Sequence, residues 1–144
     1  MNFIFARSAS YDAWLPRALG FLRIIAALLI LERGMSKLFG FPHVAAFDGL
    51  SRLSLTGLAG LIEAVCGGLI LIGLFTRPAA LIMSTKMAFA YITQHASAAV
   101  FPVQNGGDAA ILYCVLLLYL VVAGSGAWGL DRTIGRQRTT SHTT

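Results

Sequence analysis

Residues Leu55–Phe75 read LTGLAGLIEAVCGGLILIGLF, and this stretch decides the fold. As a helix it has the length needed to cross the hydrocarbon core of a bilayer, about 20 apolar residues. Glu63 is the charged residue near its middle. A carboxylate inside a membrane-spanning helix is costly unless it is protonated, paired or turned toward water. Glu63 is therefore the first candidate for a functional residue.

The composition of the whole chain is that of a membrane protein. Of its 144 residues, 57% are hydrophobic and 12% are charged, and the mean hydropathy is +0.76. The apolar residues form long blocks, which indicates a chain that crosses the membrane several times. The net charge is +5, but the basic residues lie near the ends of these blocks. We therefore expect membrane lipids as partners, and not nucleic acid.

Four apolar blocks predict an all-α fold, a bundle of four transmembrane helices. The spans are expected at about residues 16–38, 55–75, 78–93 and 108–123. Pro16 suits a first helical turn, whereas Gly40-Phe41-Pro42 and Gly124-Ser125-Gly126 end helices. Residues 16–131 would then form one membrane bundle. Residues 1–15 would form a cytoplasmic N-terminal segment and residues 132–144 a flexible polar tail.

The distribution of basic residues predicts the orientation of these spans. Four spans place both termini and the loop at Arg77 on one side of the membrane, together with Arg7, Arg17, Arg132, Arg136 and Arg138. The opposite loops carry Lys37 and Arg52, and none of the residues 96–107 is Lys or Arg. Cytoplasmic loops carry the excess of basic residues, so both termini are expected in the cytoplasm.

Several motifs, in this order, resemble the DoxX family of small four-helix membrane proteins. They are Leu22-Arg23, Glu32-Arg33-Gly34-Met35-Ser36-Lys37-Leu38-Phe39-Gly40-Phe41-Pro42, Ile62-Glu63-Ala64-Val65-Cys66-Gly67-Gly68, Gly73-Leu74-Phe75-Thr76-Arg77, His95, Asn105-Gly106-Gly107-Asp108, Gly124-Ser125-Gly126 and Leu130-Asp131. The resemblance extends from about Ala18 to Asp131. Asp108 stands where the family more usually has a glutamate, which leaves an acid in place with a shorter reach.

The resemblance implies a four-helix bundle in the bacterial inner (cytoplasmic) membrane. It also implies a link to oxidoreductase systems, because family members include subunits of thiosulfate:quinone oxidoreductase and of membrane complexes that respond to oxidative stress. Related branches carry paired cysteines for thiol chemistry. Here Cys66 and Cys114 stand alone inside separate spans, so a dithiol relay has no support.

Polar residues gather in the outer half of the expected bundle. Counting the helical rise places there Glu32, Arg33, Lys37, Glu63, Gln94, His95, Asn105 and Asp108. Such a set could bind a quinone, whose carbonyls need hydrogen-bond donors and whose reduction needs protons. Glu63, His95 and Asp108 are the candidate proton donors and acceptors. Arg33, Lys37, Gln94 and Asn105 are the candidate ligand-binding residues.

The alternative reading of the same residues is structural. Glu63 paired with Arg33 or Lys86 would hold the helices in register. Helix periodicity places Arg23, Gly34 and Lys37 on one face, expected toward the bundle, and Glu32 nearly opposite, toward a partner subunit or the headgroup layer. Arg23 is expected to be structural or to snorkel toward the lipid surface. Gly60, Ala64 and Gly68 form a small-residue stripe that allows a neighbouring helix to approach closely.

Motifs for other chemistry are missing from the sequence. It contains no P-loop, no dinucleotide-binding GxGxxG, no HExxH and no nucleophile elbow. Its three histidines do not provide a haem or zinc site inside the spans. A quinone is therefore the cofactor that we consider, and no metal, haem or nucleotide is supported.

Three functions remain open from the sequence. The first is a membrane subunit of a quinone-linked oxidoreductase system, which would be part of an enzyme and not a complete one. The second is a non-catalytic structural or assembly subunit of a larger membrane complex. The third is a proton-coupled or small-solute carrier that uses Glu63 and Lys86. A homo-oligomer or a larger membrane complex is expected in each case.

Overall fold

The computed structural model describes residues 9–47 and 54–134, and every regular element within these ranges is helical. Four long helices dominate: α1 (Ala9–Phe39), α2 (Leu55–Ile72), α3 (Thr76–Ala90) and α5 (Asp108–Ala123). Three short elements connect them: η1 (Ala45–Phe47), a π-helical turn η2 (Tyr91–His95) and α4 (Pro102–Asn105). The all-α fold class is confirmed. The predicted cytoplasmic segment and tail lie mostly outside the described residues.

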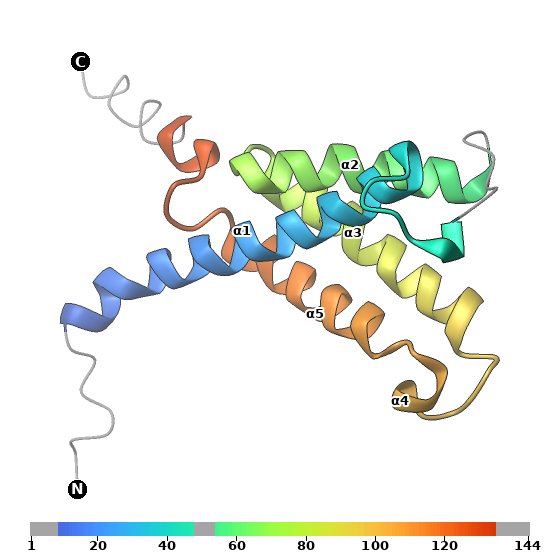
Figure 1. Ribbon diagram of the computed structural model, residues 1–144. Helices are drawn as coiled ribbons and strands as arrows, with labels where there is room; N and C mark the ends of the chain where they lie inside the picture. The colour runs from blue at the N-terminus through green and yellow to red at the C-terminus, as the bar shows by residue number, and fades with distance from the viewer. Residues whose placement is uncertain (1–8, 48–53, 135–144) are drawn as a thin grey trace, which may run out of the picture.

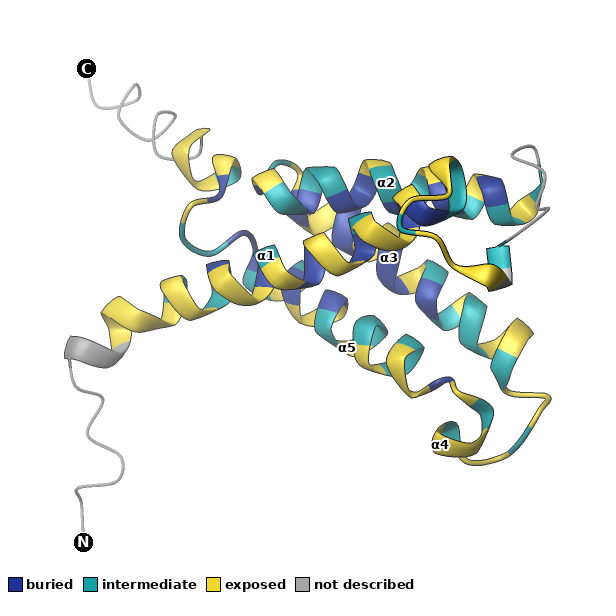
Figure 2. Cartoon of the chain, viewed as in Figure 1, coloured by how far each residue is buried: buried dark blue, intermediate teal, exposed yellow. Residues whose placement is uncertain are grey.

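The helices pack as two pairs, which converge where α2 ends, α3 begins and α5 ends, next to the middle of α1 (Figure 1). Helix α1 lies along α2, and α3 lies along α5, while α2 and α3 join the pairs (Figure 1). The buried residues lie where the helices come together, and the outer faces of the helices are exposed (Figure 2). The core contains Ala27, Ile30, Cys66, Ile70, Ala79, Ala80, Met83, Met87, Leu117 and Leu120, so all four long helices contribute to it.

The outer surface of the helices is apolar. Phe21 of α1, Leu61 of α2, Ile82 of α3 and Leu112 of α5 are all exposed, as are many similar residues. Two helical stretches, Asp12–Phe39 and Leu55–Ile72, are long and apolar enough to span a membrane, and Asp108–Ala123 is a shorter apolar helix. An apolar outer surface of this extent is compatible with lipid and not with water.

Four helix boundaries differ by two residues or more from those predicted. Helix α2 ends at Ile72 and not at residue 75, and α3 begins at Thr76 and not at residue 78. The first helix begins at Ala9 and not at Pro16, so that Pro16 lies inside it. The π-helical turn extends the third helix to His95, beyond the predicted end at residue 93. Propensity alone does not define such ends, because tertiary contacts outweigh it: the Pro16 carbonyl, for example, accepts a hydrogen bond from Ala127 N at 2.6 Å.

Glycines allow α1 and α2 to approach closely. A Cβ atom on Gly34 would lie 2.6 Å from Ala64 N and 2.9 Å from Gly60 O. One on Gly67 would lie 3.1 Å from Leu31 N, whereas no described atom lies within 4 Å of one on Gly68. The small-residue stripe therefore exists, but the prediction that Gly68 belongs to it is wrong. A spacing of four residues drifts around a helix of 3.6 residues per turn, so the stripe continues at Gly67.

We expect Gly34→Ala to lower the free energy of unfolding by about 1–3 kcal/mol, because the added methyl group must push the two helices apart. Gly68→Ala is the matched control and should leave stability unchanged or raised, since Ala is the better helix former and the site is open. Thermal unfolding of both variants in detergent measures the difference. Equal stabilities would contradict this account of the α1–α2 contact.

Arg23 joins the helix ends on the side where α2 ends and α3 begins. Its side chain is fully buried. Nε donates to Ser125 O at 2.8 Å, Nη1 donates to the carbonyls of Ile70 and Leu71 at the end of α2, and Nη2 donates to Ala127 O at 3.5 Å. The structural role expected for Arg23 is thus present, and the alternative that it snorkels toward lipid is wrong, because four carbonyls satisfy it inside the protein.

Asp131 stabilises the same end of the bundle. Its two carboxylate oxygens accept hydrogen bonds from Phe75 N and Thr76 N, each at 2.8 Å, at the start of α3. A carboxylate is favourable there because a helix N-terminus presents unpaired N–H groups and a partial positive charge. Its backbone N–H also donates to Gly73 O at 2.9 Å, so the chain after α5 is tied to the α2–α3 turn.

Candidate functional site

The candidate site is centred on Glu63 and two lysines, which we call the Glu63 triad (Lys37, Glu63 and Lys86). Lys37 Nζ of α1 lies 2.9 Å from Oε1 and 2.8 Å from Oε2 of Glu63 on α2. Lys86 Nζ of α3 donates to Oε1 of the same carboxylate. Three helices therefore meet at one buried carboxylate.

The close α1–α2 contact positions Lys37. A Cβ atom on Gly60 would lie 2.8 Å from the Lys37 Cβ, so the lysine side chain crosses α2 at a residue with no side chain of its own. The Lys37 ammonium also lies 5.5 Å from the centre of the Phe47 ring, a distance typical of a cation–π contact. The prediction that Arg23, Gly34 and Lys37 face the bundle is confirmed by their low exposure, whereas Glu32 is exposed.

Exposure differs across the Glu63 triad. The side chain of Glu63 is 0% exposed, that of Lys37 8% and that of Lys86 17%. An ammonium group has three N–H donors, and Lys86 uses one of them on Glu63. Among the described residues it has no other partner, so donors remain on the most accessible member of the triad.

The charges of the Glu63 triad do not cancel. Two ammonium groups face one carboxylate, so one positive charge is left over when all three groups are ionised. A net charge in a low-dielectric interior is unfavourable unless a further anion or a strong dipole compensates for it. The arrangement can therefore donate hydrogen bonds to an oxygen atom, and it favours an oxygen that carries negative charge.

His95 and Asn105 form a second polar group, in the loop between α3 and α5. His95 Nδ1 lies 2.9 Å from Asn105 O, and Asn105 Nδ2 donates to Ala99 O at 2.9 Å. Asn105 Oδ1 accepts from Gly107 N at 2.8 Å. His95 follows Lys86 by about 13 Å along the helix axis, at ~1.5 Å per residue. The single polar site expected from the sequence is therefore two separate groups.

The remaining candidate residues lie on the surface. Asp108 is exposed, and its Oδ1 accepts from Ala109 N at 2.9 Å at the start of α5. Gln94 and Arg33 are also exposed. Of the two cations proposed as partners of Glu63, the structure selects Lys86. In the ranges that it describes, Arg33 makes no ion pair with Glu63.

Sequence reasoning underestimated three residues. Lys86 was considered only as a pairing or carrier residue, although it is the most accessible cation of the Glu63 triad. Asp131 was noted only as part of a motif, and Arg23 was expected to be structural or to snorkel, but both bond to groups far away along the chain. The sequence did contain a signal for Lys86 and Arg23. A charge in an apolar span is costly without a partner, so both residues need a partner as much as Glu63 does.

We expect Glu63→Leu to lower the free energy of unfolding by about 3–5 kcal/mol, because it leaves two ammonium groups buried without a counter-charge. Ile62→Leu, the apolar control next to it, should be close to wild type. Thermal unfolding and oligomeric state in mild detergent measure both effects.

The combined variant Lys37→Met/Glu63→Leu/Lys86→Met should recover most of the lost stability, because it removes the charges together. A Glu63→Leu protein with wild-type stability and assembly would show that the ion pairs are not needed.

Comparisons with known proteins place the chain among membrane proteins. A sequence model of the DoxX family matches residues 18–96. An uncharacterized protein of Haemophilus influenzae is 40% identical over 124 residues, which cover 83% of this chain and 92% of that protein. An uncharacterized membrane protein of Mycobacterium tuberculosis is 28% identical over 138 residues, which cover 82% of each chain. No solved structure matches this chain.

Proposed function

Because this chain belongs to the DoxX family of membrane proteins, we propose that it is an integral membrane subunit of a quinone-linked oxidoreductase system. In this proposal the Glu63 triad is the place where the subunit meets the quinone headgroup. The observation that supports it most is the unused donor capacity of Lys86, next to a positive charge that Glu63 does not balance.

The residues of the Glu63 triad fit a quinone carbonyl group. A quinone supplies a ring that takes up electrons and protons at its oxygens. Lys86 can donate a hydrogen bond to one of these oxygens, and the leftover positive charge favours the negative charge that arrives with electrons. Glu63 holds the Lys86 ammonium in place, and Lys37 keeps Glu63 oriented. The electrons come from another subunit of the system.

His95 has a different part in this proposal from the one expected. Within the described residues His95 forms no hydrogen bond with the Glu63 triad, and its Nδ1 lies 2.9 Å from Asn105 O. His95, Asn105 and Gly107 form a hydrogen-bonded loop instead, and this loop connects α3 to α5. The proposed headgroup site therefore rests on Lys86, Glu63 and Lys37 and does not use His95, Gln94, Asn105 or Asp108.

A non-catalytic assembly subunit is the second candidate. Both oxygens of Glu63 are occupied by lysines from α1 and α3, which is the arrangement expected of ion pairs that hold helices in register. The exposed Glu32 and Arg33 on α1 would then contact a partner polypeptide.

The proposed topology has four spans in the bacterial inner membrane and both termini in the cytoplasm. Helix α3, with 15 residues, continues without a break into the five-residue turn η2. Together they form a rod of about 30 Å, the thickness of the hydrocarbon core. Arg17, Arg77 and Arg132 belong to the helix ends assigned to the cytoplasm, in agreement with the positive-inside rule.

A fluorescent protein that folds only in the cytoplasm tests this topology. Fused after Thr144 it should fluoresce, because the positive-inside rule keeps that end in the cytoplasm. A periplasmic reporter enzyme inserted in the loop after Ser97 should be active for the same reason. The reverse pattern would overturn the orientation. A result that places the C-terminus and the loop after Ser97 on the same side of the membrane would overturn the number of spans.

Lys86→Met should lower the amount of quinone that co-purifies with the protein at least tenfold, as measured by solvent extraction and chromatography. The variant should still fold, because Lys37 and Glu63 remain as a neutral pair. Thr85→Met, an exposed neighbour on the same helix, is the control and should retain quinone.

Two results would count against the quinone role. One is a wild-type protein that carries no more quinone than an unrelated membrane protein purified in the same way. The other is an equal amount of quinone in Lys86→Met. Co-purification of a polypeptide that is lost in Glu32→Ala, without quinone, would favour the assembly subunit.

A further inference from the structure

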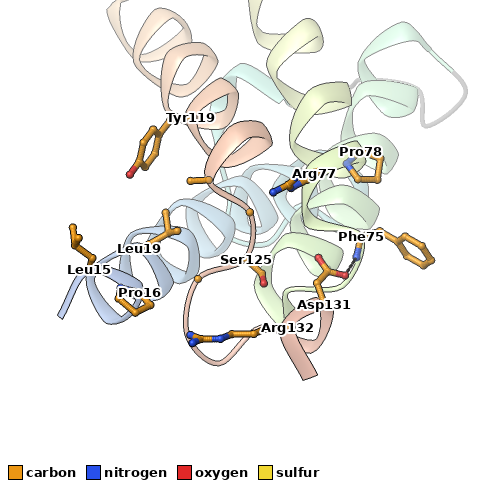
Figure 3. A pocket seen from close by; sticks show the side chains of 13 residues that line it. Leu15, Pro16, Leu19, Phe75, Arg77, Pro78, Tyr119, Ser125, Asp131 and Arg132 are labelled. Atoms are coloured by element: carbon orange, nitrogen blue, oxygen red, sulfur yellow. Dashed lines mark hydrogen bonds between the residues drawn. The ribbon is translucent and has the colours of Figure 1, made fainter. Parts of the chain in front are cut away.

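A cavity of about 720 Å³ lies at the end of the bundle where α2 ends and α3 begins. It is bounded by the first part of α1, the start of α3, the end of α5 and the chain that follows α5 (Figure 3). Leu15 and Leu19 of α1 line its apolar side, and its polar side chains are those of Arg77, Tyr119, Ser125, Asp131 and Arg132. None of the residues of the Glu63 triad lines it.

The two arginines of this cavity have no counter-ion. Neither guanidinium makes a hydrogen bond or an ion pair with any residue in the described ranges, and both side chains are exposed. Asp131 is the one acid among the described lining residues, and both of its oxygens accept hydrogen bonds from the start of α3. The cavity therefore has an excess of positive charge and two planar guanidinium groups whose N–H donors are unused within the described residues.

The turn after α5 lies next to Arg77. Gly124 has φ +81°, a conformation that side chains rarely adopt, and a Cβ atom on it would lie 3.5 Å from Arg77 Nε. The Arg77 side chain thus lies against the Gly124-Ser125-Gly126 turn, which Arg23 holds in place through Ser125 O. Arg77 and Arg132 come from two segments that line one cavity, and they extend to different sides of the turn (Figure 3).

The surroundings place this cavity at the membrane surface. Trp14 and Trp128 are exposed at the same end, and Arg17 lies 5.2 Å from the centre of the Trp14 ring. Tryptophan and arginine at the ends of apolar helices are typical of the headgroup layer. A ligand here meets cations on one side and apolar side chains on the other.

We propose that this cavity binds the phosphate group of an anionic glycerophospholipid. The positive charge of Arg77 and Arg132 favours the phosphate, and guanidinium groups are well suited to donate hydrogen bonds to its oxygens. The acyl chains lie along Leu15 and Leu19 toward the apolar surface of α1. Basic pockets between transmembrane helices bind anionic headgroups in this way. The proposal does not depend on the quinone site or on the direction in which the chain is inserted.

Native mass spectrometry of the detergent-purified protein tests the proposal with two lipids of equal chain length, phosphatidylglycerol and phosphatidylcholine. We expect the wild-type protein to bind phosphatidylglycerol about tenfold more tightly, and Arg77→Gln/Arg132→Gln to lose this preference. Arg17→Gln removes the same charge at the same end, outside the cavity lining, and should keep the preference.

The single variant Arg132→Gln should show a partial loss, and it provides the test if the double variant does not fold. Equal binding of the two lipids by the wild-type protein, or an unchanged preference in the folded arginine variants, would overturn the proposal. Inorganic phosphate distinguishes the source of the anion. If phosphate alone stabilises the wild-type protein to heat and phosphatidylglycerol does not, the cavity is a site for free phosphate and not for a lipid.

Discussion

The rest of the structure depends on one constraint, that each charge inside an apolar bundle needs a partner within it. Glu63 has no access to solvent, so its carboxylate requires cations from neighbouring helices. Lys37 and Lys86 meet this requirement, and their ion pairs set the register of α1 and α3 along α2. The glycines at the α1–α2 contact contribute to the same arrangement, because Lys37 crosses α2 at Gly60 on its way to the acid.

The same constraint operates at the other end of the bundle with backbone groups. Arg23 is fully buried and uses carbonyl oxygens in place of a carboxylate. These carbonyls belong to the end of α2 and to the turn after α5, where the hydrogen bonds of a regular helix are no longer available. Asp131 has the complementary role, because its carboxylate accepts hydrogen bonds from the N–H groups at the start of α3. The family motifs around these residues are therefore parts of one junction between helix ends.

The two ends of the molecule have different chemical capacities. The Glu63 triad is enclosed, and its unused donors belong mainly to Lys86. The arginine-lined cavity is open and lies at the level of the exposed tryptophans. An enclosed cationic site suits a small electron-rich group that enters from the membrane, whereas an open cationic cavity suits a headgroup that stays at the surface. The proposed quinone and lipid roles use these two sites separately.

The helical class, the approximate helices and the burial of Glu63 follow from the sequence alone, because a long unbroken apolar block satisfies its own backbone in lipid as a helix. Residues 108–123, for example, were predicted with the bounds that α5 has. Helix periodicity also predicted the face of α1 that turns inward. Only the tertiary structure decided which charges meet: Lys37 and Lys86 at Glu63, Arg23 at carbonyls, and His95 in a loop of its own. A sequence gives the direction and rough depth of a side chain on its own helix, but the close approach and relative shift of two helices follow from how their surfaces pack.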